Sequence, residues 1–334
     1  MMNLKKLMTA TACAALAFSP ALAAAQTDSL PVGRCVNMGN HLEPPKEGDW
    51  GRKIADNDFQ IIAAAGFDTI RLPVRWSAYA DDAAPYTIQE SFMNRVKHVV
   101  FLAREAGLNV ILDDHHYEEL YKEPAKHAPR LAGLWSQIAS EFADQPTEHL
   151  WFEIENEPHD KLTHKNLLDT LTPALSAIRA TNADRPVIIG GELWSGINSL
   201  ATLPLPDDPH IVPTFHYYDP FPFTHQGATW VDTPPPLGRK YGTQEDQKAL
   251  DDDVQKIRDY ITRTGKTPFM GEFGAIDLIP VAERVQYQKA VRTAFDAVDI
   301  GMCAWAYTNT FPLYDSRTKK WLPGMLDAMG LKDK

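Results

Sequence analysis

The chain has 334 residues, of which 44% are hydrophobic and 23% are charged. These proportions are typical of a soluble globular protein and exclude disordered, collagen-like and disulfide-scaffold sequences. Lys and Arg number 33 against 44 Asp and Glu, and the resulting net charge of -11 disfavours binding to nucleic acid or to anionic lipid. The 8 Trp residues offer flat apolar rings of the kind that pack against sugar faces.

Residues 1–25 have the pattern of a secretory signal peptide. A short basic segment precedes the apolar run 7–18, and small residues follow at positions 23–25, where a signal peptidase would cleave. A membrane anchor is the less favoured alternative, because the apolar run is shorter than the roughly 20 residues that span a bilayer. We therefore expect a secreted or periplasmic protein that has no membrane contact after cleavage, with residues 26–334 forming one domain.

The rest of the chain alternates short apolar runs with segments of helical period, which is typical of parallel βαβ units. The eight predicted strands are Arg34–Met38, Thr69–Val74, Asn109–Asp113, Leu150–Ile154, Pro186–Ile189, Ile211–Phe215, Pro268–Glu272 and Met302–Tyr307. The predicted helices are Asn57–Ala65, Ser91–Ala106, Ala132–Phe142, Asn166–Ala180, Gln244–Thr264 and Ala282–Val298. Eight such units without a glycine-rich phosphate motif predict an α/β fold, a single-domain (β/α)8 TIM barrel, rather than a doubly wound open sheet.

Two cysteines, Cys35 and Cys303, remain once Cys13 is removed with the signal peptide. They are too few for a cysteine-based metal or redox motif. Both lie on predicted strands, the first and the eighth, which become neighbours when a barrel closes. Because parallel neighbours seldom offer disulfide geometry, we expect two buried thiols rather than a disulfide.

Polar and aromatic side chains lie at or near the carboxyl ends of the predicted strands, where barrel enzymes carry their active sites. These candidates are Asn40, Arg71, His115, His116, Asn156, Glu157, His216, Tyr218, Glu272 and Trp305. Strands that only pack a core have no need of acids, bases and amides at these positions. The set therefore indicates a functional site over the barrel.

Glu157 and Glu272 end the fourth and seventh predicted strands. These strands face each other across an eight-stranded barrel, so the two carboxylates can meet over its centre. Hydrolysis of a glycosidic bond uses such a pair, one protonating the leaving oxygen and the other attacking or stabilising the anomeric carbon. Arg71 can keep one glutamate ionised, while the approach of two like charges raises the pKa of the other.

Six segments, in this order, resemble glycoside hydrolase family 5, the cellulase A family. They are Ile70-Arg71-Leu72-Pro73, Asp114-His115-His116, Asn156-Glu157-Pro158 after Phe152-Glu153-Ile154, Phe215-His216-Tyr217-Tyr218, Gly271-Glu272-Phe273-Gly274 and Ala304-Trp305. The resemblance covers nearly all of the chain after the signal peptide. It implies a retaining endo-β-1,4-glucanase that hydrolyses cellulosic or mixed-linkage glucans by a two-glutamate double displacement, with no cofactor and no metal.

The resemblance also implies a role for each site residue. Glu157 is the expected acid/base and Glu272 the expected nucleophile. The expected supporting residues are Arg71 and Tyr218 beside the nucleophile, Asn156 at the sugar 2-hydroxyl, and the histidines His116 and His216. The segment 37–43 with 47–51 resembles bacterial members that act on both β-1,4-glucans and β-mannans, which implies that Asn40 and Glu43 bind sugar hydroxyls.

Two tryptophans are the predicted stacking platforms for sugar rings, and His115 completes the predicted binding set. Trp305 lies near the carboxyl end of the last predicted strand, and Trp230 lies on the loop 219–241, whose length is typical of a functional loop. Ala306 stands where many relatives carry an acidic residue after the tryptophan, so subsite preference stays open. Trp76, Trp135 and Trp151 are expected in the core, and Trp50 and Trp194 are left unassigned.

Several alternatives stay open. The enzyme could be a β-1,4-mannanase or glucomannanase, or the fold could serve a non-catalytic polysaccharide-binding protein. A metal-dependent hydrolase using His115 and His116 is less favoured, because adjacent strand residues point to opposite faces. For Glu153 we expect an ion pair with Arg71 inside the barrel or a contact with a helix. A monomer is the default oligomeric state.

Overall fold

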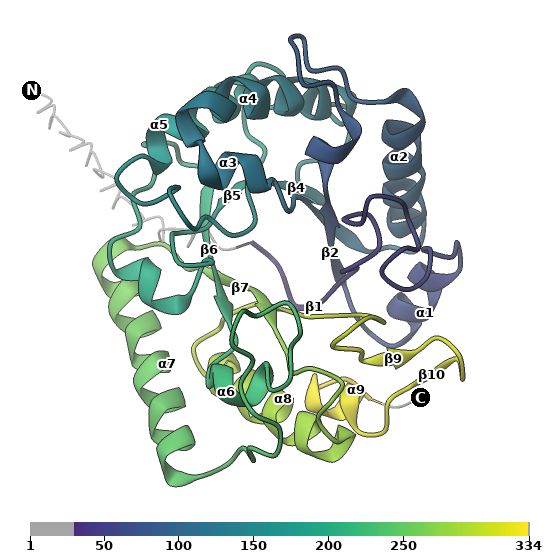
Figure 1. Cartoon of the computed structure of the whole chain (residues 1–334), viewed down its shortest axis with the longest axis vertical. Helices are drawn as coiled ribbons and strands as arrows, with labels where there is room; N and C mark the ends of the chain where they lie inside the picture. Colours follow the sequence, from purple (N-terminus) through teal and green to yellow (C-terminus); the bar gives the residue numbers. More distant parts are fainter. Residues whose placement is uncertain (1–29, 333–334) are drawn as a thin grey trace, which may run out of the picture.

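The computed structural model describes residues 30–332, and the predicted signal peptide lies outside the described residues. Eight parallel strands pair in chain order, and β1 pairs with β8 to close a barrel (Figure 1). The strands are β1 (Arg34–Asn37), β2 (Thr69–Val74), β3 (Asn109–Asp114), β4 (Leu150–Glu153), β5 (Val187–Ile189), β6 (Ile211–Tyr217), β7 (Phe269–Phe273) and β8 (Met302–Ala304). The predicted (β/α)8 barrel is confirmed.

Helices surround the barrel (Figure 1). They are α1 (Asp58–Ala64), α2 (Glu90–Glu105), α3 (Glu118–Lys122), α4 (Pro124–Glu141), α5 (Leu167–Arg179), α6 (Phe221–Thr224), α7 (Gln244–Thr264), α8 (Val281–Asp296) and α9 (Met325–Ala328). Two 3₁₀ helices, η1 (Trp76–Tyr79) and η2 (Ile197–Ala201), and the hairpin of β9 (Tyr314–Asp315) and β10 (Lys320–Trp321) complete the fold. The described residues contain no helix that is both long and apolar enough to cross a membrane.

One helix begins earlier than the sequence predicts. Helix α4 starts at Pro124 instead of Ala132, and it contains Pro129. Proline suits the first helical position, because that residue has no helical partner for an amide hydrogen. The short helix α3 just before it was not predicted.

The barrel interior changes from apolar at the bottom to polar at the top. Ile111 on β3 and Trp151 on β4 belong to an apolar cluster inside the barrel. Side chains two residues apart on a strand face the same way, so Asp113 and Glu153 continue the same inward rows one step higher. The alternation of the strands thus delivers charged groups to the carboxyl end of the barrel, while Trp76, Trp135 and Trp151 are buried as predicted.

A disulfide joins Cys35 and Cys303 across the seam between β1 and β8. The prediction of two free thiols is therefore wrong. The two residues are register partners whose Cα atoms lie 4.2 Å apart, and both belong to the apolar cluster inside the barrel. Their side chains consequently point to the same side of the sheet and are close enough to bond. The expectation of two thiols rested on the rarity of disulfides between parallel strands, and the sequence did not reveal this register.

Candidate active site

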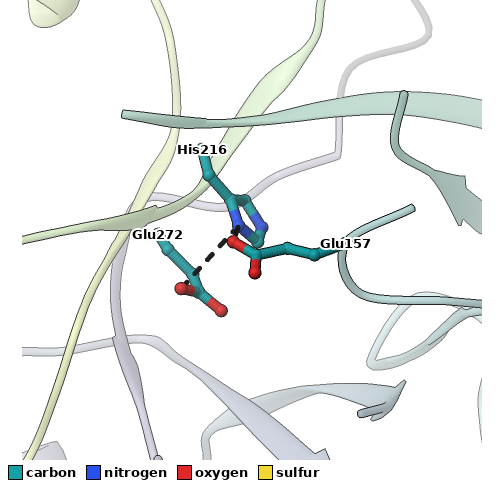
Figure 2. Close-up of side chains that lie close together, drawn as sticks. All are labelled: Glu157, His216 and Glu272. Carbon is teal, nitrogen blue, oxygen red and sulfur yellow. Dashed lines mark hydrogen bonds and ion pairs between the residues drawn. The ribbon is translucent and has the colours of Figure 1, made fainter. Parts of the chain in front are cut away.

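Glu157 and Glu272 meet at the carboxyl end of the barrel, on either side of one imidazole. Glu157 follows β4, Glu272 lies on β7, and His216 lies on β6 between them in space (Figure 2). One oxygen of each carboxylate and one ring nitrogen of His216 all lie within 4.8 Å of one another. The structure thus brings together the two glutamates that the sequence analysis paired across the barrel.

Glu157 is held by His216 and has a raised pKa. Its Oε1 lies 2.7 Å from His216 Nδ1. Burial raises the pKa of Glu157 to about 7, although the positive charge of Arg71 opposes the shift. A carboxyl group with such a pKa keeps its proton close to neutral pH, so it can act as an acid.

Glu272 is buried, with a hydrogen-bond donor on each oxygen. Arg71 Nη1 donates to Oε1 at 2.8 Å, and the hydroxyl of Tyr218 donates to Oε2 at 2.8 Å. Burial raises the pKa of Glu272, whereas the nearby His216, Arg71 and Tyr218 act in the opposite direction. Both donors favour the carboxylate form, which is the form that can attack a carbon.

Arg71 is fully buried and binds both Glu272 and the acidic residues Glu153 and Asp113 inside the barrel. Its Nε and Nη2 bond both oxygens of Glu153 at 2.7 and 2.9 Å, and Nη2 lies 3.0 Å from Asp113 Oδ2. The bidentate pair holds the plane of the guanidinium, which aims Nη1 at Glu272. The interpretation of Glu153 as an interior partner of Arg71 is confirmed.

Asn156 is oriented by three bonds. Arg71 Nη2 donates to its Oδ1 at 2.7 Å, and its backbone amide donates to the Asp114 carbonyl at 3.0 Å. Its own carbonyl accepts from Ser195 Oγ at 2.9 Å. Because Oδ1 accepts from a cation, the amide presents Nδ2 as its donor for another group.

The rings of His115 and His116 lie next to each other with their planes at right angles. His115 Nδ1 lies 2.6 Å from Asp113 Oδ2, and its ring stacks on Trp305 with 5.6 Å between centroids and 6° between planes. The His116 ring stands edge-on to His115, and its backbone has a positive φ of 59°. The two rings do not form a shared metal site; among residues 30–332, Glu157, His216 and Glu272 form the cluster with ligand spacing.

Two glycines make room for site side chains, and neither was predicted as a site residue. A Cβ at Gly271 would lie 2.8 Å from His216 Nε2, and a Cβ at Gly39 would lie 2.7 Å from the ring of Trp305. Each glycine therefore lets a functional ring approach the backbone closely. Gly271 belongs to the segment Gly271-Glu272-Phe273-Gly274 and Gly39 to the segment 37–43, which carry the resemblance, but the sequence does not show which side chains these glycines accommodate.

Glu43 is not placed to bind a sugar, which corrects the prediction from the resemblance. The residue is fully buried, and its Oε1 accepts the amide of Asn40 at 2.6 Å. Its Oε2 accepts the amides of His41 and Leu42 at 2.8 and 3.0 Å. The carboxylate instead shapes the turn in which Asn40 has a positive φ of 65° and is half-buried.

Exposed tryptophans lie on loops at the carboxyl end of the barrel. Trp230, on the loop after β6, is 56% exposed and stands edge-on to His225. Trp194, after β5, is 53% exposed and stacks on His159 with 5.0 Å between centroids. Trp305, by contrast, is mostly buried. The sequence offered no signal for Trp194, whose position depends on three successive residues with positive φ.

The chain is similar in sequence to known proteins. The sequence model of the family described as cellulase (glycosyl hydrolase family 5) matches residues 33–311. Endoglucanase H of Acetivibrio thermocellus is 32% identical over 304 residues, which are 89% of this chain and 33% of that protein. The chain spans about a third to a half of the length of the first curated relatives that it matches.

Solved structures of Thermotoga maritima Cel5A match closely. The structure described in complex with cellobiose has a TM-score of 0.87 at 39% identity, covering 89% of this chain and 97% of that one. The structure described in complex with mannotriose has a TM-score of 0.87 at 38% identity, covering 90% and 98%. From the barrel, the paired glutamates and these similarities together, we conclude that the chain belongs to glycosyl hydrolase family 5.

Proposed function

We propose that the protein is a retaining endo-β-1,4-glucanase that cleaves internal bonds of cellulosic or mixed-linkage glucans. The observation that carries this proposal is the approach of Glu157 and Glu272, one oxygen of each lying within 4.8 Å of the other. Retaining glycosidases hold their carboxyl groups about 5–5.5 Å apart, whereas inverting enzymes leave about 6.5–9.5 Å for a water molecule. The spacing in this protein supports retention.

In the first step, Glu272 attacks the anomeric carbon while the bond from that carbon to the leaving oxygen breaks. Glu157 gives its proton to the leaving oxygen, so the released sugar departs as an alcohol. The product is a covalent ester between the remaining sugar and Glu272. The pKa of about 7 for Glu157 supports its role as the proton donor at neutral pH.

In the second step, Glu157 is a carboxylate and takes a proton from water. The resulting hydroxide attacks the anomeric carbon and displaces Glu272, which regenerates both groups and restores the original configuration. The hydrogen bonds of Glu272 to Arg71 and Tyr218 suit this step, because they stabilise the carboxylate that leaves.

The surrounding residues support binding of a sugar at the reacting carbon. Asn156 presents Nδ2 as a donor for the 2-hydroxyl, and His216 orients Glu157 through a 2.7 Å bond. His115 and Trp305 stack on each other, and we assign both to contacts with this sugar. We assign Asn40, His116 and Trp230 to contacts with further sugar units.

A β-1,4-mannanase or glucomannanase activity is the second candidate. The Thermotoga maritima Cel5A structures, described with cellobiose and with mannotriose, support both candidates. Glucose and mannose units differ only at carbon 2, so the contact at Asn156 is the one that would discriminate. A purely binding protein is less well supported, because two apposed carboxyl groups have no use in binding a neutral chain.

We also propose that the protein works in an oxidising compartment, secreted or periplasmic. The Cys35–Cys303 disulfide supports this location, because disulfides persist where thiols are not kept reduced. The apolar and basic pattern of residues 1–25 supports it independently.

Parallel hydrolysis of carboxymethyl-cellulose, barley β-glucan, glucomannan and galactomannan, with and without chelator, tests the activity. We expect short oligosaccharides from the glucans and no effect of chelator. Cleavage of galactomannan alone would instead assign a mannanase. Activity lost with chelator, or no activity on any of the four, would contradict the proposed mechanism.

Rescue by azide tests the two glutamate roles separately, on an aryl cellobioside with a good leaving group. Azide should react with Glu272→Ala to give an α-glycosyl azide, because it replaces the missing nucleophile directly. With Glu157→Ala it should give a β-glycosyl azide, because it attacks the covalent intermediate. Exchange of these two products between the variants would reverse the assignment.

A further inference from the structure

Trp50 is a large exposed side chain beside the site that the mechanism does not use. It lies on the loop from β1 to α1, and its side chain is 43% exposed. Its ring stands edge-on to His116, with 5.8 Å between centroids and 79° between planes. The loop lies at the carboxyl end of the barrel, next to β2 (Figure 1).

A carboxylate clamp fixes the part of this loop that carries Trp50, residues 47–54. Glu47 Oε1 accepts the amide of Ile54 at 3.0 Å and Arg95 Nη2 at 2.8 Å, while Oε2 accepts Arg95 Nε at 3.0 Å. Arg95 Nη2 also donates to the Ile54 carbonyl at 2.9 Å. Because Arg95 belongs to α2, the clamp ties both ends of the segment 47–54 to a long helix.

The loop is also docked against the segment after β8. Gly51 has a φ of 146°, and a Cβ there would lie 2.5 Å from the side chain of Asn309. The Asn309 amide in turn donates to the Asn40 carbonyl at 3.4 Å. On the other side, Arg52 bonds both oxygens of Asp58 at 2.8 and 2.9 Å. Trp50 is therefore exposed on a loop that is held from several directions.

We propose that Trp50 is a stacking platform for an additional β-1,4-linked pyranose unit, beyond the two units that flank the cleaved bond, and that Glu47 and Arg95 are its positioning residues. The proposal rests on the proposed function. An exposed indole offers a face to the apolar C–H groups of a pyranose, and a fixed loop lowers the entropy lost on binding. Glucose and mannose units both present such groups. We therefore expect Trp50 to favour longer chains over shorter ones, whichever of the two sugars they contain.

Kinetics on cellotriose, cellotetraose, cellopentaose and cellohexaose test the platform. Trp50→Ala should lower kcat/KM on cellohexaose about tenfold, mostly through KM, and the loss should shrink as the chain shortens. Trp50→Phe should retain most of the activity on long chains. The control Phe101→Ala removes an aromatic ring that is 58% exposed on α2 and should change none of these values.

Arg95→Met tests the positioning role. It breaks the clamp without touching the platform, so it should reproduce the length-dependent loss of Trp50→Ala with an unchanged pH profile. Equal losses on every chain length would indicate a merely structural role and overturn the assignment of Arg95.

Binding to Glu272→Ala by calorimetry makes the test independent of turnover. Trp50→Ala in this background should weaken cellohexaose about tenfold and cellotriose less. Equal affinities with and without Trp50 would overturn the platform. An unaltered protein that cleaves neither glucan nor mannan would contradict the proposed function instead, and calorimetry would still decide the role of Trp50.

Discussion

The hydroxyl of Tyr218 donates a 2.8 Å hydrogen bond to Oε2 of Glu272, the oxygen opposite the one that Arg71 holds. Both donors favour the ionised carboxylate, whereas burial raises the pKa of Glu272. The protonation state of this glutamate is therefore the result of opposing effects, and removal of one donor should shift it measurably.

Tyr218→Phe should raise the pKa of Glu272, because it deletes a bond to the charged form. Activity needs Glu272 ionised, so the acidic limb of the kcat/KM profile should move to higher pH. A hydrogen bond to a charged group contributes about 1.5–3 kcal/mol, so the second step, in which Glu272 leaves as a carboxylate, should slow by roughly 10- to 100-fold, which kcat reports. Tyr241→Phe, a control that removes a hydroxyl elsewhere, should leave the limb in place. An acidic limb that stays fixed in Tyr218→Phe would show that this bond does not control Glu272.

The alkaline limb of the pH profile of kcat/KM should report the pKa of Glu157. Burial raises its pKa to about 7, and the first step needs its proton, so kcat/KM should fall as pH rises through about 7. The measurement is kcat/KM for an oligosaccharide from pH 4 to 10. A 2,4-dinitrophenyl cellobioside is the matched substrate, because its leaving group departs without a proton. For that substrate, kcat/KM should no longer fall on the alkaline side. If kcat/KM falls with the same pKa for both substrates, that pKa belongs to a group other than Glu157.

Gly271→Ala should disturb the acid/base through His216. The new Cβ would lie 2.8 Å from His216 Nε2 and 3.0 Å from Thr214 Oγ1, both in a buried region. The imidazole must move away, which breaks the 2.7 Å contact of its Nδ1 with Glu157. Displacement of about 1 Å can cost 100-fold in rate, so we expect kcat to fall about 10- to 100-fold. Thermal unfolding monitored by circular dichroism should show a folded variant, and full activity in that variant would refute the role given to Gly271.

The sequence predicts the barrel and its central pair well, for a physical reason. The alternation of strands and helices and the residue types at strand ends can be read from short stretches of sequence. Because the barrel is closed, each strand end then has a known position around its rim. Glu157 and Glu272 were found because acids at the ends of apolar strands have no structural use. Arg71 and Glu153 were paired correctly because both face inward near the end of their strands.

The wrong predictions and the unassigned residues concern backbone geometry and register, which residue type and hydrophobic pattern do not reveal. Glu43 looked like a sugar ligand, yet three loop amides occupy its oxygens, and no local pattern reveals that. The exposure of Trp194 depends on a run of positive φ angles. The register between β1 and β8 places Cys35 opposite Cys303. The two residues are 268 apart in the sequence, so no local pattern predicts that they are partners.

The seam disulfide should stabilise the barrel strongly. It links residues 268 apart, and closing so long a loop lowers the conformational entropy of the unfolded chain, which is equivalent to about 5–6 kcal/mol of stability. Cys35→Ala should therefore lower the free energy of unfolding in urea by roughly that amount, and Cys303→Ala should do the same. The double variant should be no less stable than either single variant, apart from the small cost of a second lost sulfur, because each change removes the same bond. Thiol titration of the unfolded parent protein without residues 1–25 should find no free cysteine. Two reactive thiols there, or urea midpoints that do not change on reduction, would show that the bond is not formed.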